Sequence, residues 1–147
     1  MNKEKQLLVE ISTGELLDKI TILELKIQNF SNQAQLENVS RELEHLRKVF
    51  FENICLTQEL LNLMQELRYI NKMLWELEDN IRELERKNQF DKEFIETARQ
   101  IYLTNNNRIE IKKKICIITC SKFFEEKNYS NGNVSNQLGN RVCLDKK

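Results

Sequence analysis

The chain of 147 residues has no proline and only three glycines, at positions 14, 132 and 139, so the long stretch from Glu15 to Asn131 contains neither residue. Proline and glycine are the strongest helix breakers and the usual residues of tight turns. Glycine-rich loops also bind the phosphates of nucleotides in mononucleotide and dinucleotide folds. The composition therefore argues against an all-β sandwich and a Rossmann domain, and it favours helices.

An excess of one charge and a long apolar run are also missing. The 23 Lys and Arg residues balance 23 Asp and Glu residues, so no long-range field favours nucleic acid or an anionic membrane as a partner. The apolar run at 115–118 is far shorter than the roughly 20 residues that span a bilayer. No hydrophobic segment follows the first residues, which argues against a secretory signal. We expect a cytoplasmic protein with neither a membrane nor a nucleic-acid partner.

The cysteines do not form a recognisable metal or disulfide pattern. They stand at positions 55, 116, 120 and 143, and the single histidine, His45, is distant from them in the sequence. Cys116 and Cys120 are four residues apart on a predicted helix, and two thiolates make only half of a tetrahedral zinc site. We predict free thiols in a reducing compartment and no metal site.

The sequence has strong helical patterning. Its 31% charged and 40% hydrophobic residues suit amphipathic helices with wide solvated faces. Ser12, Asn32 and Asp91 are predicted to cap helices, with Ser12 in a capping box with Glu15. These signals predict helices over about 12–29, 32–51, 57–87 and 91–119. A turn or kink is expected between 51 and 57 and an irregularity at 105–107, although the second and third segments could also form one helix.

Apolar residues recur at alternating steps of four and three along these segments. The stripes on the first three helices are Leu16, Ile20, Leu23, Ile27 and Phe30, then Leu36, Val39, Leu43, Leu46 and Phe50, then Leu63, Leu67, Ile70, Leu74, Leu77, Ile81 and Leu84. The third stripe keeps its heptad-like spacing the longest. The predicted fold is therefore all-α, an antiparallel bundle of about four helices with long heptad-patterned hairpins.

Domain organisation follows from the end of the pattern. Residues 1–129 are predicted to form a single helical domain, in which the segment 121–129 docks against the bundle in extended form. Residues 130–147 are polar and almost patternless. Such a composition cannot bury enough apolar surface to offset its chain entropy, so we predict a disordered C-terminal tail.

Polar residues at inward positions are the candidates for function, because sites in helical bundles are built from side chains on facing helices. In the segment 91–119, the apolar seam that starts at Phe94, Ala98 and Ile101 is predicted to continue as Asn105, Arg108 and Lys112 before Ile115 restores it. A buried cation without a partner costs several kcal/mol. Each cation on this seam therefore needs a carboxylate, a bound anion or water.

The helix predicted over 57–87 has a second face. Arg68, Trp75 and Arg82 recur every seven residues and lie off the main apolar stripe. A large aromatic side chain at such a position suggests that this helix is central and covers a second partner helix. Asp79 and Arg82 are then expected to form a partly buried ion pair.

Two interpretations of these charges stay open. In the first, Arg108 and Lys112 pair with carboxylates of other helices, at Glu24, Glu78, Asp79 or Glu85, and fix the register of the bundle. In the second, the charges line a small-molecule pocket. Its candidate catalytic residues are Glu15, Asp18, Glu24, Glu78 and Asp79. Its candidate binding residues are Lys19, Arg82, Arg99, Tyr102, Asn105, Arg108 and Lys112.

The pocket interpretation allows two enzyme classes, each with an incomplete match. Carboxylates one turn apart on facing helices could hold Mg²⁺ against a phosphate, as helical nucleotide pyrophosphatases do, and only this reading calls for a cofactor. The paired acidic motifs of those enzymes are not present in order, and Glu76-x-Glu78-Asp79 is a partial likeness. A chorismate mutase-like bundle is suggested by residues 16–26, but no arginine cluster accompanies it.

Several of the segments above also carry a resemblance to a known family. They are Gly14-Glu-Leu-Leu-Asp-Lys-Ile-Thr-Ile-Leu-Glu24, Leu74-Trp-Glu-Leu-Glu-Asp-Asn-Ile-Arg82, the residues 90–105 with Arg108 and Lys112, and Glu125-Glu-Lys-Asn-Tyr129. Together, over about residues 10–129, the chain resembles an uncharacterised family of small bacterial and phage proteins, a domain of unknown function. The resemblance implies an all-helical cytoplasmic protein and supplies no activity. The residues beyond Tyr129 do not match it.

The sequence therefore leads to two hypotheses about function. The first is a non-enzymatic module that self-associates or binds a partner helix through its heptad seams. The second is a small-molecule or phosphate-handling enzyme with an inter-helix site of carboxylates and cations, which would bind a small anionic ligand.

Overall fold

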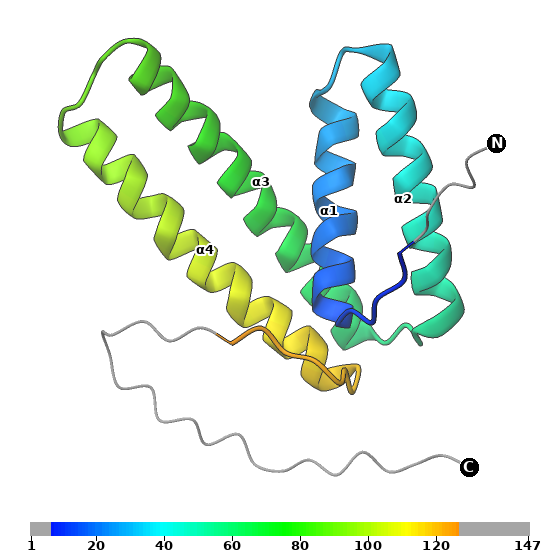
Figure 1. Cartoon of the computed structure of the whole chain (residues 1–147). Helices are drawn as coiled ribbons and strands as arrows, with labels where there is room; N and C mark the ends of the chain where they lie inside the picture. Colours follow the sequence, from blue (N-terminus) through cyan, green and yellow to red (C-terminus); the bar gives the residue numbers. More distant parts are fainter. Residues whose placement is uncertain (1–6, 127–147) are drawn as a thin grey trace, which may run out of the picture.

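The computed structural model describes residues 7–126, and in this range it consists of four α-helices. They are α1 (Thr13–Asn29), α2 (Gln33–Asn53), α3 (Gln58–Arg86) and α4 (Lys92–Ile118), arranged as two antiparallel hairpins, α1 with α2 and α3 with α4 (Figure 1). The predicted all-α fold is confirmed. Residues 54–57 are not helical, so α2 and α3 are separate helices. Helix α4 runs through 105–107 without interruption. The predicted tail at 130–147 lies outside the described residues.

Side chains rather than glycines and prolines delimit these helices. The side-chain oxygens of Ser12, Asn32 and Thr57 each accept a hydrogen bond of 3.1 Å from a backbone N–H in the first turn of α1, α2 and α3. Asp91 does the same for α4, at 3.0 and 3.3 Å. These bonds satisfy donors that a helix start leaves free. The caps predicted at Ser12, Asn32 and Asp91 are confirmed. The carboxylate of Glu15, which the predicted capping box assigned to the backbone N–H of Ser12, instead pairs with Lys112 at 2.6 Å.

Helices α3 and α4 are each followed by a residue that has a left-handed backbone conformation and is not glycine. Asn88 and Cys120 both have φ of 51°. Beyond each of them a backbone N–H returns to the helix, from Gln89 to Leu84 and from Ser121 to Cys116, each at 2.9 Å. This is the Schellman arrangement, in which glycine is the favoured residue. Asparagine tolerates the conformation better than cysteine does, so the end of α4 carries local strain.

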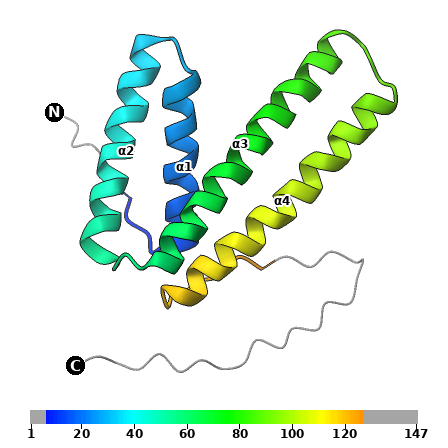
Figure 2. The ribbon, with the colours of Figure 1, turned by 180° about the vertical axis from the view of Figure 1, so that it is seen from behind.

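The two hairpins converge at one end and diverge toward their loops, as the two views in Figures 1 and 2 show. Helix α1 packs against α2, α3 and α4, so α1 is the central helix. Helix α3 packs against two helices, α4 and α1, so the second partner helix predicted for the 57–87 segment is present. The helix with the most partners is nevertheless α1 rather than α3. The core lies where α1 meets the other helices, around the fully buried Leu17, Phe50, Leu60, Leu67 and Ile115.

Gly14 marks the closest approach of α1 to α4. A Cβ atom at this position would lie 2.8 Å from the backbone oxygen of Lys112 and 2.9 Å from Sγ of Cys116. Real Cβ atoms do not approach other atoms so closely. The single glycine of the helical region is therefore used for helix packing, and it brings the first turn of α1 against the face of α4 that carries Lys112.

The buried face of α4 is rotated from the predicted one. Its buried residues are Thr97, Thr104, Ile109, Ile111, Lys112, Ile115 and Cys116, while Phe94, Ala98 and Ile101 are only partly buried. The reason is that two threonines, which the apolar pattern does not count, face inward. Segment 121–126 docks against the bundle, because Ser121 bonds with Thr13 and Glu125 with Lys112. This agrees with the docking predicted for 121–129, of which 127–129 lie outside the described residues.

Candidate functional site

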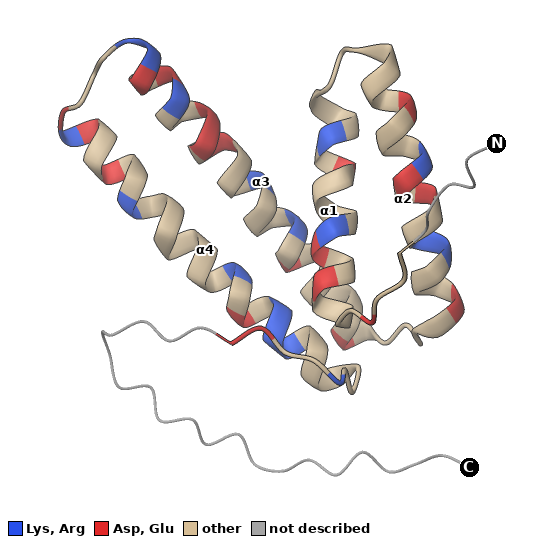
Figure 3. Ribbon diagram, in the orientation of Figure 1, with Lys and Arg blue, Asp and Glu red and all other residues tan. Residues whose placement is uncertain are grey.

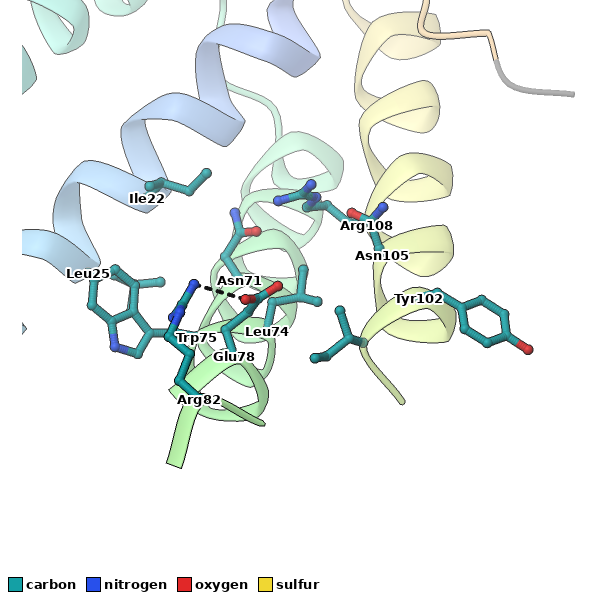
Figure 4. Close-up of a pocket in the computed structure, with 11 residues that line it drawn as sticks. Ile22, Leu25, Asn71, Leu74, Trp75, Glu78, Arg82, Tyr102, Asn105 and Arg108 are labelled. Atoms are coloured by element: carbon teal, nitrogen blue, oxygen red, sulfur yellow. Dashed lines mark hydrogen bonds and ion pairs between the residues drawn. The ribbon is translucent and has the colours of Figure 1, made fainter. Parts of the chain in front are cut away.

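An open groove of about 580 Å³ lies between the two hairpins, on the side where α1 faces α3 and α4 (Figure 4). We call it the hairpin groove. Its apolar wall comes from α1, α3 and α4, and its polar groups come from α3 and α4. The lining residues are Ile22, Leu25, Asn71, Leu74, Trp75, Glu78, Arg82, Ile101, Tyr102, Asn105 and Arg108. The α3 residues among them recur at steps of three and four, so they share one face of the helix.

Asn71 is the most buried polar residue of the groove, with 3% of its surface exposed. Its Nδ2 donates to Oδ1 of Asp18 and to Oγ1 of Thr21, both at 2.8 Å. The hydroxyl of Thr21 already donates to the backbone oxygen of Asp18 at 2.8 Å. Asp18 and Thr21 can therefore only accept hydrogen bonds from Asn71, so the amide nitrogen of Asn71 must face them. The amide orientation is thus fixed by chemistry, and Oδ1 must point the other way.

Oδ1 of Asn71 is buried and has no hydrogen-bond partner among the described residues. The same holds for Nε of Arg108, which lines the groove from α4. Figure 4 shows the guanidinium of Arg108 reaching from α4 toward the side where Asn71 lies. Buried polar atoms without partners are rare in native proteins. Here one acceptor and one cationic donor line the same groove.

Lys112 is the centre of a separate ionic cluster at the end where the helices converge. Only 5% of this residue is exposed. Its Nζ lies 2.6 Å from a carboxylate oxygen of Glu15, 2.6 Å from one of Glu125 and 3.8 Å from one of Asp18. The prediction that Lys112 pairs with Glu24, Glu78, Asp79 or Glu85 was wrong. The short distance between α1 and α4 at Gly14 brings the first-turn carboxylates of α1 to Lys112 instead.

The cluster keeps Lys112 protonated. Burial alone would lower the pKa of Lys112, but hydrogen bonds to Glu125 and Glu15 and the charge of Asp18 outweigh it and raise the pKa above its usual value. Asp18 in turn accepts the hydrogen bond from Asn71. The cluster is therefore connected to the hairpin groove through Asp18. Within residues 7–126, no group of three or more His, Cys, Asp and Glu residues is arranged to hold a metal ion.

Glu24 joins three helices. It accepts hydrogen bonds from Arg47 of α2 and Arg68 of α3, each at 2.8 Å. Burial of Glu24 raises its pKa, but the hydrogen bonds from Arg68 and Arg47 and their charges outweigh this and hold the pKa below the usual range. This glutamate is therefore a structural clamp between α1, α2 and α3, and both of its oxygens are engaged.

The other candidate residues have different surroundings. Glu78 and Arg82 line the groove and pair with each other at 3.0 Å (Figure 4). Arg82 and Asp79 are about 65% exposed in their side chains, so the prediction of a partly buried pair was wrong. They lie on the part of α3 that extends beyond α1. Lys19 is exposed and pairs with Glu42 of α2.

The last three candidates lie on α4. Asn105 lines the hairpin groove beside Arg108. Tyr102 lines its edge, and in Figure 4 its ring points away from the other residues. Arg99 is exposed and is not among the residues of the groove. The structure thus brings Glu78, Arg82, Tyr102, Asn105 and Arg108 to one site, and Glu15, Asp18 and Lys112 to the neighbouring cluster.

Sequence reasoning missed Asn71, Thr21 and Glu125, which hold these two sites together. Asn71 sits between the core positions Leu67 and Leu74, so a lone amide within an apolar stripe was the available signal. Glu125 stood in a segment that carries the family resemblance, but its role could not be predicted, because its position depends on how the segment after α4 folds back. The described cysteines, Cys55, Cys116 and Cys120, are free, and Cys143 lies outside the described residues.

Charges of both signs are distributed along both hairpins (Figure 3). In the described part of the chain, every helix is too short or too polar to cross a membrane. Fold and groove together define a small all-helical protein built from two diverging hairpins with one mixed polar and apolar groove between them.

The sequence model of the Family of unknown function (DUF6165) matches residues 7–139, and the chain belongs to this family. The predicted resemblance to an uncharacterised family is thereby confirmed. The match continues past Tyr129, although the residues beyond Tyr129 were predicted not to match. The bacterial and phage origin of the family stays a prediction. No curated protein and no solved structure gives a significant match to the chain.

Proposed function

We propose that this protein is a binding module whose hairpin groove takes a small anionic group of a ligand. The observation that carries the proposal is the pair of buried, unpartnered atoms, Oδ1 of Asn71 and Nε of Arg108. A buried polar atom left without a partner costs about 1–3 kcal/mol. A ligand that supplies both missing partners would recover this cost on binding.

Size and charge of the groove support the same proposal. Its volume of about 580 Å³ lies within the range of about 300–1,000 Å³ that is typical of small-ligand sites. Arg82 and Arg108 line it together with one carboxylate, that of Glu78. Two cations against one anion leave one excess positive charge. Since Glu78 already pairs with Arg82, Arg108 is the cation available to the ligand.

The described carboxylates favour binding over acid-base or metal-assisted chemistry. Glu15 and Asp18 lie around Lys112, and Glu24 lies between two arginines. A carboxylate that already pairs with a cation is poorly placed to take up a proton or a metal ion, because either step would weaken that pairing. The pyrophosphatase-like and chorismate mutase-like alternatives therefore gain no support from these positions.

A thermal-shift screen tests the proposal. Simple carboxylates, phosphates and sulfonates are added to the wild-type protein, to Arg108→Gln and to Arg99→Gln. Arg99 is the matched control, because it is an exposed arginine of the same helix outside the groove. A ligand at one hundred times its Kd stabilises by about 2.7 kcal/mol. We expect shifts in the wild type and in Arg99→Gln that vanish in Arg108→Gln. Anion-dependent shifts that are equal in all three proteins would refute the proposal.

Self-association is a second candidate function, supported by exposed apolar side chains. Ile95, Tyr102 and Leu103 on the outer side of α4 are 57%, 52% and 44% exposed. Ile95 and Tyr102 are two turns apart on one face of the helix, and exposed apolar patches mark interfaces. Sedimentation equilibrium of the wild type and of Ile95→Lys tests this. A dimer that is lost in the variant supports self-association, and a monomeric wild type at high concentration excludes it.

A further inference from the structure

The hydrogen-bonding pattern at the closed end of the hairpin groove defines the chemistry of its ligand, if the proposed function holds. Oδ1 of Asn71 needs a donor, and Nε–H of Arg108 needs an acceptor. Because Asp18 and Thr21 fix the amide of Asn71, this residue cannot rotate to offer a donor instead. A bare anion satisfies Arg108 and leaves Asn71 unpaired. The complementary ligand therefore carries an N–H or O–H beside its anionic oxygens.

The remaining walls of the groove are apolar. Ile22 and Leu25 of α1, Leu74 of α3 and Ile101 of α4 line it together with the ring of Trp75. Trp75 also lies 6.4 Å from the ring of Phe30, which holds it near the end of α1. A ligand that is anionic at one end and apolar along its length would match both parts of the groove.

The length of the groove suggests a chain rather than a compact molecule. The lining residues of α3 run from Asn71 to Arg82, which at a rise of about 1.5 Å per residue is roughly 16 Å. An extended peptide advances about 3.3 Å per residue, so about five residues span this distance.

We propose that the hairpin groove captures the free C-terminus of an apolar peptide segment of a partner protein. The terminal carboxylate accepts from Arg108, and the N–H of the last residue donates to Oδ1 of Asn71. The preceding side chains pack against Leu25, Leu74 and Trp75. Capture of a chain end by a few fixed polar groups is a known mode of peptide recognition, and it gives a chemical basis to the interaction module expected from the sequence.

Trp75 is the only tryptophan of the chain, so its fluorescence reports directly on the groove. The probe is the peptide acetyl-Ala-Leu-Ala-Leu-Leu with a free carboxylate. Four compounds are compared with it: the same peptide as its C-terminal amide, the same peptide with the last peptide nitrogen methylated, decanoate and acetyl-leucine. Each is titrated into the wild type, Arg108→Gln and Arg99→Gln. Circular dichroism verifies that the variants keep their helical content.

The expected result is that the free acid binds the wild type and Arg99→Gln about tenfold to a hundredfold more tightly than the amide, which is the usual effect of a charge-assisted hydrogen bond. Arg108→Gln should lose this difference. Methylation of the last peptide nitrogen should weaken binding about fivefold or more, because Asn71 then stays unpaired.

The other outcomes separate this inference from the proposed function. If decanoate and the methylated peptide bind as well as the free acid and depend on Arg108, the groove binds anions and the assignment to a peptide end is wrong. If acetyl-leucine binds as tightly as the five-residue peptide, the ligand is a small acylated amino acid and the partner-protein assignment is wrong. If no probe binds in a manner that depends on Arg108, both proposals are wrong.

Discussion

Replacement of Lys112 by methionine should leave three carboxylates around an uncharged side chain. Lys112 is 5% exposed, and its Nζ lies against carboxylate oxygens of Glu15, Asp18 and Glu125. Methionine has a similar length and is apolar, so the volume of the side chain is largely kept. The perturbation therefore removes charge and hydrogen bonding with little change in packing.

The magnitude follows from the exposure of the three carboxylates. Loss of one partner from a buried ion pair costs about 3–5 kcal/mol. The side chains of Glu15 and Glu125 are 50% and 24% exposed and can turn to water, whereas that of Asp18 is 10% exposed and cannot. We therefore expect a loss near the lower limit, about 3 kcal/mol. For a chain of this size, that corresponds to a decrease of roughly 6–12 °C in Tm.

Urea denaturation followed by circular dichroism at pH 7 measures this loss. In the wild type the pKa of Lys112 is raised above 10.5, so its contribution is complete below pH 10.5 and is lost as the pH rises through the raised value. Lys114→Met is the matched control, since Lys114 is exposed on the same helix, and should change stability by about 0.5 kcal/mol or less.

One result would refute this reasoning, namely a loss at pH 7 that is no larger in Lys112→Met than in Lys114→Met. The double variant Lys112→Met with Asp18→Asn provides an independent check. It should recover part of the stability, since asparagine keeps an acceptor for Asn71 without the charge.

Three further predictions concern the packing and capping of the helices. Gly14→Ala should destabilise the protein by about 1–2 kcal/mol in urea titrations despite the better helix propensity of alanine, because the new Cβ meets a backbone oxygen at 2.8 Å; equal or higher stability would contradict the close contact. Cys120→Gly should raise stability by about 0.5–1 kcal/mol by relieving the left-handed conformation, and a lower Tm would contradict this strain. Glu24→Gln should cost about 1–2 kcal/mol at pH 7. Because the pKa of Glu24 is lowered from 4.5, the wild type loses this stability as the pH falls through the lowered value, and a deficit that does not decrease on acidification below pH 4.5 would contradict the assignment.

Local signals were sufficient to predict the secondary structure. A helix is stabilised by contacts three and four residues apart and by caps within one turn, so the stripe of Leu16 and Leu23 and the caps at Ser12, Asn32 and Asp91 could be read along the chain. The same holds for the break before α3. Face assignment failed on α4, because Thr97 and Thr104 are buried by packing and an apolar pattern does not count them.

Candidate site residues could be named from the sequence, but their partners could not. Glu15, Asp18, Arg108 and Lys112 were singled out because they are charges near apolar seams. The crossing of α1 and α4 determines which carboxylate pairs with which cation, and that crossing is set by the contact at Gly14. Glu125 reaches Lys112 only because the chain folds back after α4. No local pattern encodes such contacts between distant residues.

The shortage of glycine and proline determined by itself that this protein is helical and that any site must be built from side chains on helix faces. The tertiary structure alone decided that the two hairpins diverge and enclose a groove, and that Asn71 and Arg108 line it with unpartnered atoms. The physical reason is one of range. Helix formation depends on neighbours within one or two turns, whereas burial and pairing of a polar atom depend on every helix that surrounds it.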